Sequence, residues 1–154
     1  MRIVNQYTDP HCLKAITATW AQSGTVKTTA DGEHWRYDFP GVSSLIPEKT
    51  SDVTLVAVEM TPAATLDTFM VENAAILRQS DGLLAVDVSK ETRQMVSIVT
   101  KSETSVTLTG MLYATMSEWP ILEAVGADIF AADTAAYWPP PWERGGLSED
   151  SQPV

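Results

Sequence analysis

Apolar residues recur at helical spacing between Pro62 and Gln79. Thr61 offers a capping hydroxyl before Pro62, whose missing N–H costs nothing in a first helical turn. Asp81-Gly82 supplies a common helix end. The stripe is typical of a helix that packs one face against a core, and its members are Leu66, Phe69, Met70, Ala74 and Leu77. We therefore expect a central helix over residues 62–79.

Alternating or short apolar runs between turn residues predict five strands, at Glu33–Phe39, Val53–Met60, Leu83–Ser89, Gln94–Lys101 and Ser105–Thr115. In the first, Trp35, Tyr37 and Phe39 share one face and polar residues the other, which is typical of a strand covered on one side. Residues 53–60 are apolar on both faces, so we place them at the centre of the sheet. Gly110 indicates either a bulge or the close approach of another backbone.

Two more helices are expected near the ends of the chain. Asp9-Pro10 opens the first, which carries Leu13, Ile16 and Trp20 on one face, and the last runs from Ser117 to Ala136. The order α-β-β-α-β-β-β-α predicts an α+β fold, a two-layer domain with a mostly antiparallel sheet of about five strands and three helices. This order is similar to that of the roadblock and profilin-like folds and, loosely, of the type III secretion chaperones, which are also small and acidic.

The chain of 154 residues corresponds to a single α+β domain, which we assign to residues 1–136. Residues 137–154 are predicted to form a Trp/Pro-rich polar C-terminal tail. Proline-rich segments with exposed rings are common recognition elements because they lose little entropy on binding. The predicted partner-binding residues are therefore Tyr137, Trp138, Pro139, Pro140, Pro141 and Trp142. The alternative is that these rings fold back over the sheet or the last helix.

Twenty acidic against ten basic residues give a net charge of −10. Such a field repels phosphate backbones and anionic lipid, so we expect neither nucleic acid nor membrane as a partner. Cys12 is the only cysteine, which is typical of a reducing cytoplasm or of a particle assembled there. The first residues do not resemble a secretion signal, and no run of about 18 apolar residues predicts a transmembrane segment.

Cys12 is the first candidate for chemistry. A thiol nucleophile needs a base within hydrogen-bond reach. Neighbours in a helical turn point about 100° apart, so His11 does not face Cys12 and only His34 could serve. The simpler interpretation is a small buried core residue. One cysteine and two histidines are also too few for a structural zinc site, which takes four such ligands, and we expect no metal and no cofactor.

Three carboxylates lie on predicted strands: Asp38, Glu59 and Asp87. A carboxylate in a buried run can have a raised pKa and act as an acid or base. Carboxylates at strand ends or sheet edges are more common, and no catalytic motif accompanies these three. We assign no catalytic residue.

The leading hypothesis is a non-catalytic protein-interaction or assembly subunit of a larger complex, for example a bacteriophage particle component, with other protein chains as its partners. One alternative is a small acidic dimeric chaperone or immunity-like binding protein. Another is a small-molecule enzyme whose pocket lies between the central helix and the sheet.

Overall fold

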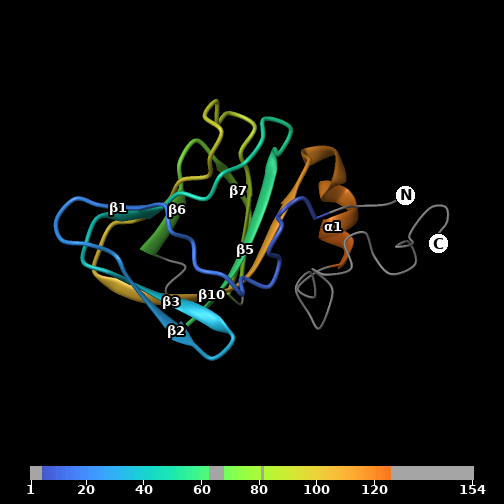
Figure 1. The fold of residues 1–154 in the computed structure, drawn as a ribbon. Coiled ribbons are helices and arrows are strands. Elements are labelled where there is room, and N and C mark those ends of the chain that lie inside the picture. Colours follow the sequence, from blue (N-terminus) through green and yellow to red (C-terminus); the bar gives the residue numbers. More distant parts are fainter. Residues whose placement is uncertain (1–4, 63–67, 81, 126–154) are drawn as a thin grey trace.

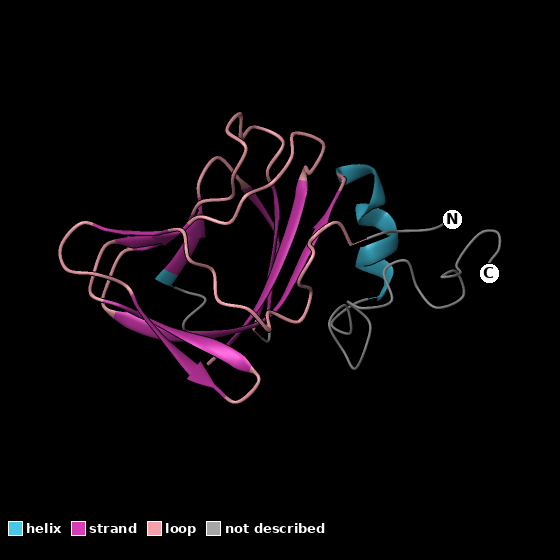
Figure 2. Ribbon diagram, viewed as in Figure 1, coloured by secondary structure: helices cyan, strands magenta, loops and turns pink. Residues whose placement is uncertain are grey.

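Two antiparallel sheets pack face to face in the computed structural model, which describes residues 5–62, 68–80 and 82–125 (Figures 1 and 2). The six-stranded sheet has the order β2 (Lys27–Asp31), β3 (His34–Phe39), β10 (Thr104–Ala114), β5 (Leu55–Thr61), β8 (Leu83–Asp87) and β7 (Ala75–Ser80). The four-stranded sheet has the order β1 (Thr19–Ala21), β4 (Ser43–Leu45), β9 (Ile98–Thr100) and β6 (Phe69–Val71). A 3-10 helix (Met116–Glu118) leads into α1 (Trp119–Val125).

Strand β5 is buried on both faces, as the two-sided apolar pattern predicted. Val56, Val58 and Met60 belong to the core between the sheets, whereas Leu55 and Ala57 belong to a second cluster on the opposite face. Helix α1 lies over that opposite face, away from β1 and β6 (Figure 1), and its Leu122 is 1% exposed there. Strand β10 likewise gives Met111 and Tyr113 to one cluster and Leu112 and Ala114 to the other.

The N-terminal segment pairs with the half of β10 that β3 leaves uncovered. Strand β3 pairs with β10 only from Thr104 to Leu108. The register against β5 shifts between Leu108 and Gly110, which agrees with the first of the two alternatives at Gly110, a bulge. Farther along β10, the Asn5 amide group donates to the Met111 carbonyl at 3.0 Å and accepts from the Tyr113 N–H at 3.0 Å. The Asn5 side chain thus makes two of the hydrogen bonds to β10 that the backbone of a neighbouring strand would otherwise make.

The predicted α+β fold with three helices is wrong: the described residues form a mostly β structure with one short α-helix. The five predicted strands contain or overlap β3, β5, β8, β9 and β10. The predicted last helix is described only as far as Val125. The described residues contain neither of the other two predicted helices, so the likeness to the roadblock and profilin-like order is lost.

The expected central helix over 62–79 is replaced by β6 and β7, with residues 63–67 outside the described part. Phe69 and Val71 are both buried and Met70 between them is 40% exposed, a period of 2 that lets β6 pair with β9. Asn73 then adopts a left-handed φ of 55°, which turns the chain into β7. The helical spacing of the apolar residues was coincidental.

The expected first helix is an irregular segment that ends in β1. Both Asp9 carboxylate oxygens accept backbone N–H groups, at 3.0 Å from Leu13 and 2.8 Å from Lys14. A helix cap would bind N–H groups two or three residues ahead, whereas these lie four and five ahead, and Cys12 has a φ of 55°. Asp9 therefore closes a loop.

Replacing Asn5 tests whether its amide group fixes the N-terminal segment to β10. Its oxygen also accepts from the Tyr7 N–H at 2.9 Å, so Asn5→Ala removes three hydrogen bonds and should lower the free energy of unfolding by about 2 kcal/mol. Urea titration followed by tryptophan fluorescence measures this change. The exposed neighbour provides the control, Gln6→Ala, which should stay within about 0.5 kcal/mol of wild type. Equal stability of the two variants would contradict this role.

Candidate functional site

A row of side chains crosses the outer face of the four-stranded sheet. Trp20 pairs with Ser44, Ser44 with Val99 and Val99 with Met70, so one residue from each strand lies in line. Residues paired in this way point to the same face. Because the strand neighbours Leu45, Ile98 and Phe69 lie in the core, this row points outward. We call Trp20, Ser44, Val99 and Met70 the apolar row.

The residues at the two ends of the apolar row are exposed, whereas Ser44 between them is nearly buried. Trp20 is 51% exposed and Met70 40%, whereas Ser44 is 8% exposed. Strands lie about 4.8 Å apart, so the row is roughly 14 Å long. Val42, 37% exposed, directly precedes β4, and its carbonyl accepts from the Gln22 N–H at 2.9 Å, next to the end of β1. The face thus offers apolar contact area on either side of the nearly buried Ser44.

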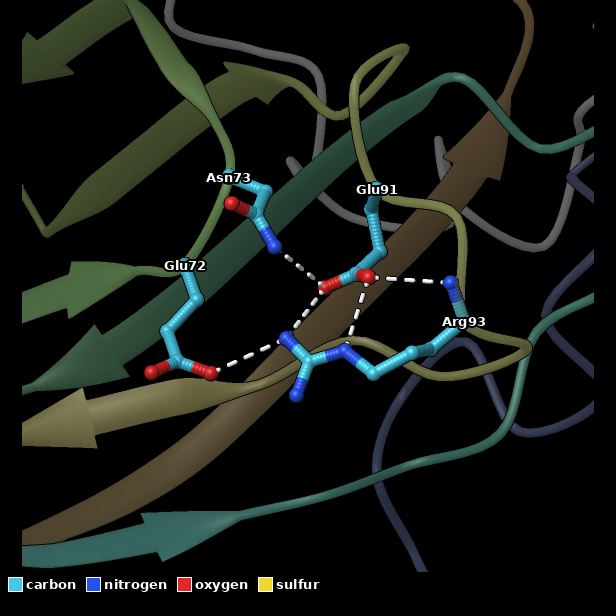
Figure 3. Close-up of polar contacts among 4 residues, drawn as sticks. All are labelled: Glu72, Asn73, Glu91 and Arg93. Atoms are coloured by element: carbon cyan, nitrogen blue, oxygen red, sulfur yellow. Dashed lines mark hydrogen bonds and ion pairs between the residues drawn. The ribbon is translucent and has the colours of Figure 1, made fainter.

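An ion-pair network holds the edge strand β6 at one end of this face (Figure 3). The Arg93 guanidinium donates through Nε to the Glu91 carboxylate at 2.9 Å and through Nη2 at 2.8 Å. The same Nη2 donates to Glu72, next to β6, at 3.0 Å. Asn73 adds a long bond of 3.4 Å to Glu91. The loop after β8 is thereby tied to the strand that carries Met70.

Glu91 is the buried centre of this network, with its side chain 1% exposed against 46% for Arg93. The hydrogen bond from Arg93 lowers the pKa of Glu91 from its ordinary 4.5 to about 2, although burial opposes the shift. The Glu91 carboxylate is ionised at neutral pH, and both of its oxygens accept hydrogen bonds from Arg93. Glu91 therefore holds the loop in place and is poorly suited to acid–base catalysis.

An open cleft of about 780 Å³ lies between the N-terminal segment and residues 46–50. Tyr7 and Tyr113 line it, with their ring centroids 4.8 Å apart in an edge-to-face arrangement. The Tyr113 hydroxyl donates to the Glu48 carbonyl at 2.9 Å, which fixes one wall. The volume of the cleft falls within the range of small-molecule sites.

The structure does not bring Cys12 and His34 together. Cys12 is 5% exposed in the core between the sheets, whereas His34 alternates with Trp35 on β3 and so points to the other face. Burial, with smaller contributions from Asp9 and Glu59, raises the pKa of the Cys12 thiol to about 12. The thiol is protonated at neutral pH, as expected of a core residue.

The three strand carboxylates do not converge either. Glu59 pairs with Leu83 and Asp87 with Leu55, so they lie at opposite ends of the β5–β8 ladder, roughly 13 Å apart. Each has a local partner: Thr109 donates to Glu59 at 2.8 Å, Ser105 to Asp38 at 2.6 Å, and the Ser89 N–H to Asp87 at 2.8 Å. The enzyme pocket expected beside a central helix has no such helix to form it.

The predicted partner-binding residues Tyr137, Trp138, Pro139, Pro140, Pro141 and Trp142 lie outside the described residues, as does the rest of the predicted tail. Sequence reasoning missed the apolar row, because Trp20 and Met70 fitted helical stripes. It also missed the ion-pair network around Glu91, although Glu91 and Arg93 are only two positions apart in a polar stretch of the sequence.

The Glu91 network should make stability depend on pH. Because folding lowers the pKa of Glu91, its charge stabilises the fold above about pH 4.5, and this is lost as the pH falls toward about 2. We expect Glu91→Gln to cost about 1 to 2 kcal/mol at pH 7 and progressively less below pH 4.5, measured by urea titration at each pH. Glu103→Gln, at an exposed position, is the control. A pH-independent cost would show that the charge is not responsible.

Comparison of the chain with protein-family models, curated proteins and solved structures gave no match. No helix in the described part is long and apolar enough to cross a membrane. Within the same residues, no group of three His, Cys, Asp or Glu side chains could hold a metal ion.

Proposed function

We propose that the protein is a non-catalytic interaction subunit of a larger complex and that it binds another polypeptide through the outer face of its four-stranded sheet. The carrying observation is the apolar row, in which half-exposed Trp20 and Met70 stand in line across four strands. Exposed apolar side chains that gather on one face of a sheet are a common feature of interaction sites.

Three features support binding rather than catalysis. Trp20 is a large ring of the type that dominates binding energy when a partner buries it. The Arg93 network fixes β6, so the face is preorganised. The candidate catalytic groups are dispersed or, like Cys12, protonated in the core.

The partner we propose is a basic polypeptide that presents apolar side chains. The net charge of −10 attracts a positively charged chain and repels a second copy of the same chain. Burying Trp20 and Met70 then provides the apolar contribution to affinity. The single unpaired thiol, Cys12, suits a complex assembled in a reducing compartment.

Disrupting the apolar row should release the chain from its complex. We expect the tagged wild-type chain, extracted from its source cells, to sediment well above its mass of 16.8 kDa, and the Trp20→Ser/Met70→Gln variant to sediment as the free chain. The matched control is Ile76→Gln, because Ile76 is 62% exposed on β7 of the other sheet. A wild-type chain at 16.8 kDa, or a variant that stays in the complex, would contradict the proposal. A complex containing only this chain would favour the dimeric alternative.

A further inference from the structure

Lys49 is a nearly buried cation in the wall of the open cleft. It follows Glu48, which forms an isolated antiparallel bridge with Met95, and the Lys49 N–H donates to the Gln94 carbonyl at 3.2 Å. The residue is only 6% exposed, which is rare for lysine unless its charge is paired. Its backbone is therefore fixed, and Lys49 is one of the residues that line the cleft of about 780 Å³.

The Lys49 ammonium has far fewer partners than it can bind. It carries three N–H donors, but in the described part of the chain it makes one hydrogen bond, to the carbonyl of adjacent Thr50 at 3.4 Å. None of the ion pairs among the described residues includes Lys49. A buried charge without a counter-ion is costly, so such a group needs either water or an anion.

The other charged groups that line the cleft do not neutralise it. Asp9 directs both carboxylate oxygens to the N–H groups of Leu13 and Lys14. Glu48 has an exposed side chain, and Lys14, also exposed, adds a second positive charge to the lining. The overall charge of −10 acts mainly through solvent, where salt screens it beyond about 8 to 10 Å. Local contacts therefore decide what binds beside Lys49.

The wall near Lys49 also suits an apolar group. Tyr7 and Tyr113 present aromatic rings to the same cleft. Tyr7 is half-buried and packs edge-to-face on Tyr113, which is 3% exposed, so Tyr7 is the ring of the pair that a ligand can reach. A ligand with an anionic end and an unsaturated or aromatic body could satisfy both features.

We propose that this cleft binds an organic carboxylate, with the Lys49 ammonium as its counter-ion and the Tyr7 ring, which packs on Tyr113, against its body. This site lies apart from the apolar row and does not depend on it. The charge-assisted hydrogen bond to Lys49 would supply the discrimination between an acid and its neutral amide.

Benzoate and benzamide provide the test, because they share a ring and differ in charge. We expect benzoate to shift the NMR signals of Lys49 and Tyr7 in the full-length chain, saturating in the range of about 1 mM, and benzamide to have no comparable effect. Lys49→Met should weaken benzoate binding at least about tenfold, and Lys49→Arg should retain most of it. Lys27→Met, on exposed β2 outside the cleft, is the control and should bind like wild type.

The melting temperature of each variant separates loss of binding from loss of fold. A short peptide with a free C-terminal carboxylate, compared with its amidated form, distinguishes a chain end from a free acid as the source of the carboxylate. The proposal is overturned if benzamide matches benzoate, if folded Lys49→Met binds benzoate like wild type, or if none of the carboxylates shifts the Lys49 signals.

Discussion

The pairing of β5 with β10 is the interaction on which the rest of this structure depends. Leu55 to Val58 on one strand and Met111 to Ala114 on the other are each at most 3% exposed, so both faces of this ladder are removed from water. A strand pair that is apolar on both faces can be stable only between two covering layers. The four-stranded sheet covers one face, and α1 with its neighbours covers part of the other.

The need to cover this ladder shapes the outer surfaces. The four-stranded sheet gives its inward residues, such as Phe69 and Ile98, to the shared core and leaves the intervening residues facing out. In a sheet that only had to cover a core, the outward residues would be polar. Here Trp20, Val99 and Met70 are apolar, which is why we propose this face as the interaction surface.

The cleft arises from the same constraint at the N-terminal end. Strand β10 extends beyond β3, and the segment from Asn5 to Pro10 covers its exposed edge by irregular pairing. Irregular backbone packs less evenly than a strand, so space remains between this segment and residues 46–50. Lys49 lies in that space without a carboxylate partner among the described residues.

The sequence was informative where one periodicity dominated. Trp35, Tyr37 and Phe39 alternate without ambiguity, and the two-sided pattern of residues 53–60 located the central strand. It misled where two periods coexisted: Phe69 and Val71 fit period 2, but Phe69 together with Leu66 and Met70 also fits a helix. Asp9-Pro10 resembles the start of a helix, but the Asp9 carboxylate accepts hydrogen bonds from the N–H groups of a loop, those of Leu13 and Lys14.

The periodicity of apolar residues could not predict the apolar row. Positions 20, 44, 70 and 99 become neighbours only through the pairing of four short strands, and no local pattern specifies that register. The buried state of Lys49 likewise depends on the path of the N-terminal segment.

Amide hydrogen exchange tests the central role of the β5–β10 ladder most directly, because it ranks each strand by the free energy needed to open it. The account predicts that the amides of Val56 to Val58 and of Leu112 to Ala114 exchange slowest in the molecule, and that those of the short strands β1 and β6 exchange faster. Exchange in β1 or β6 as slow as in β5 and β10 would contradict it.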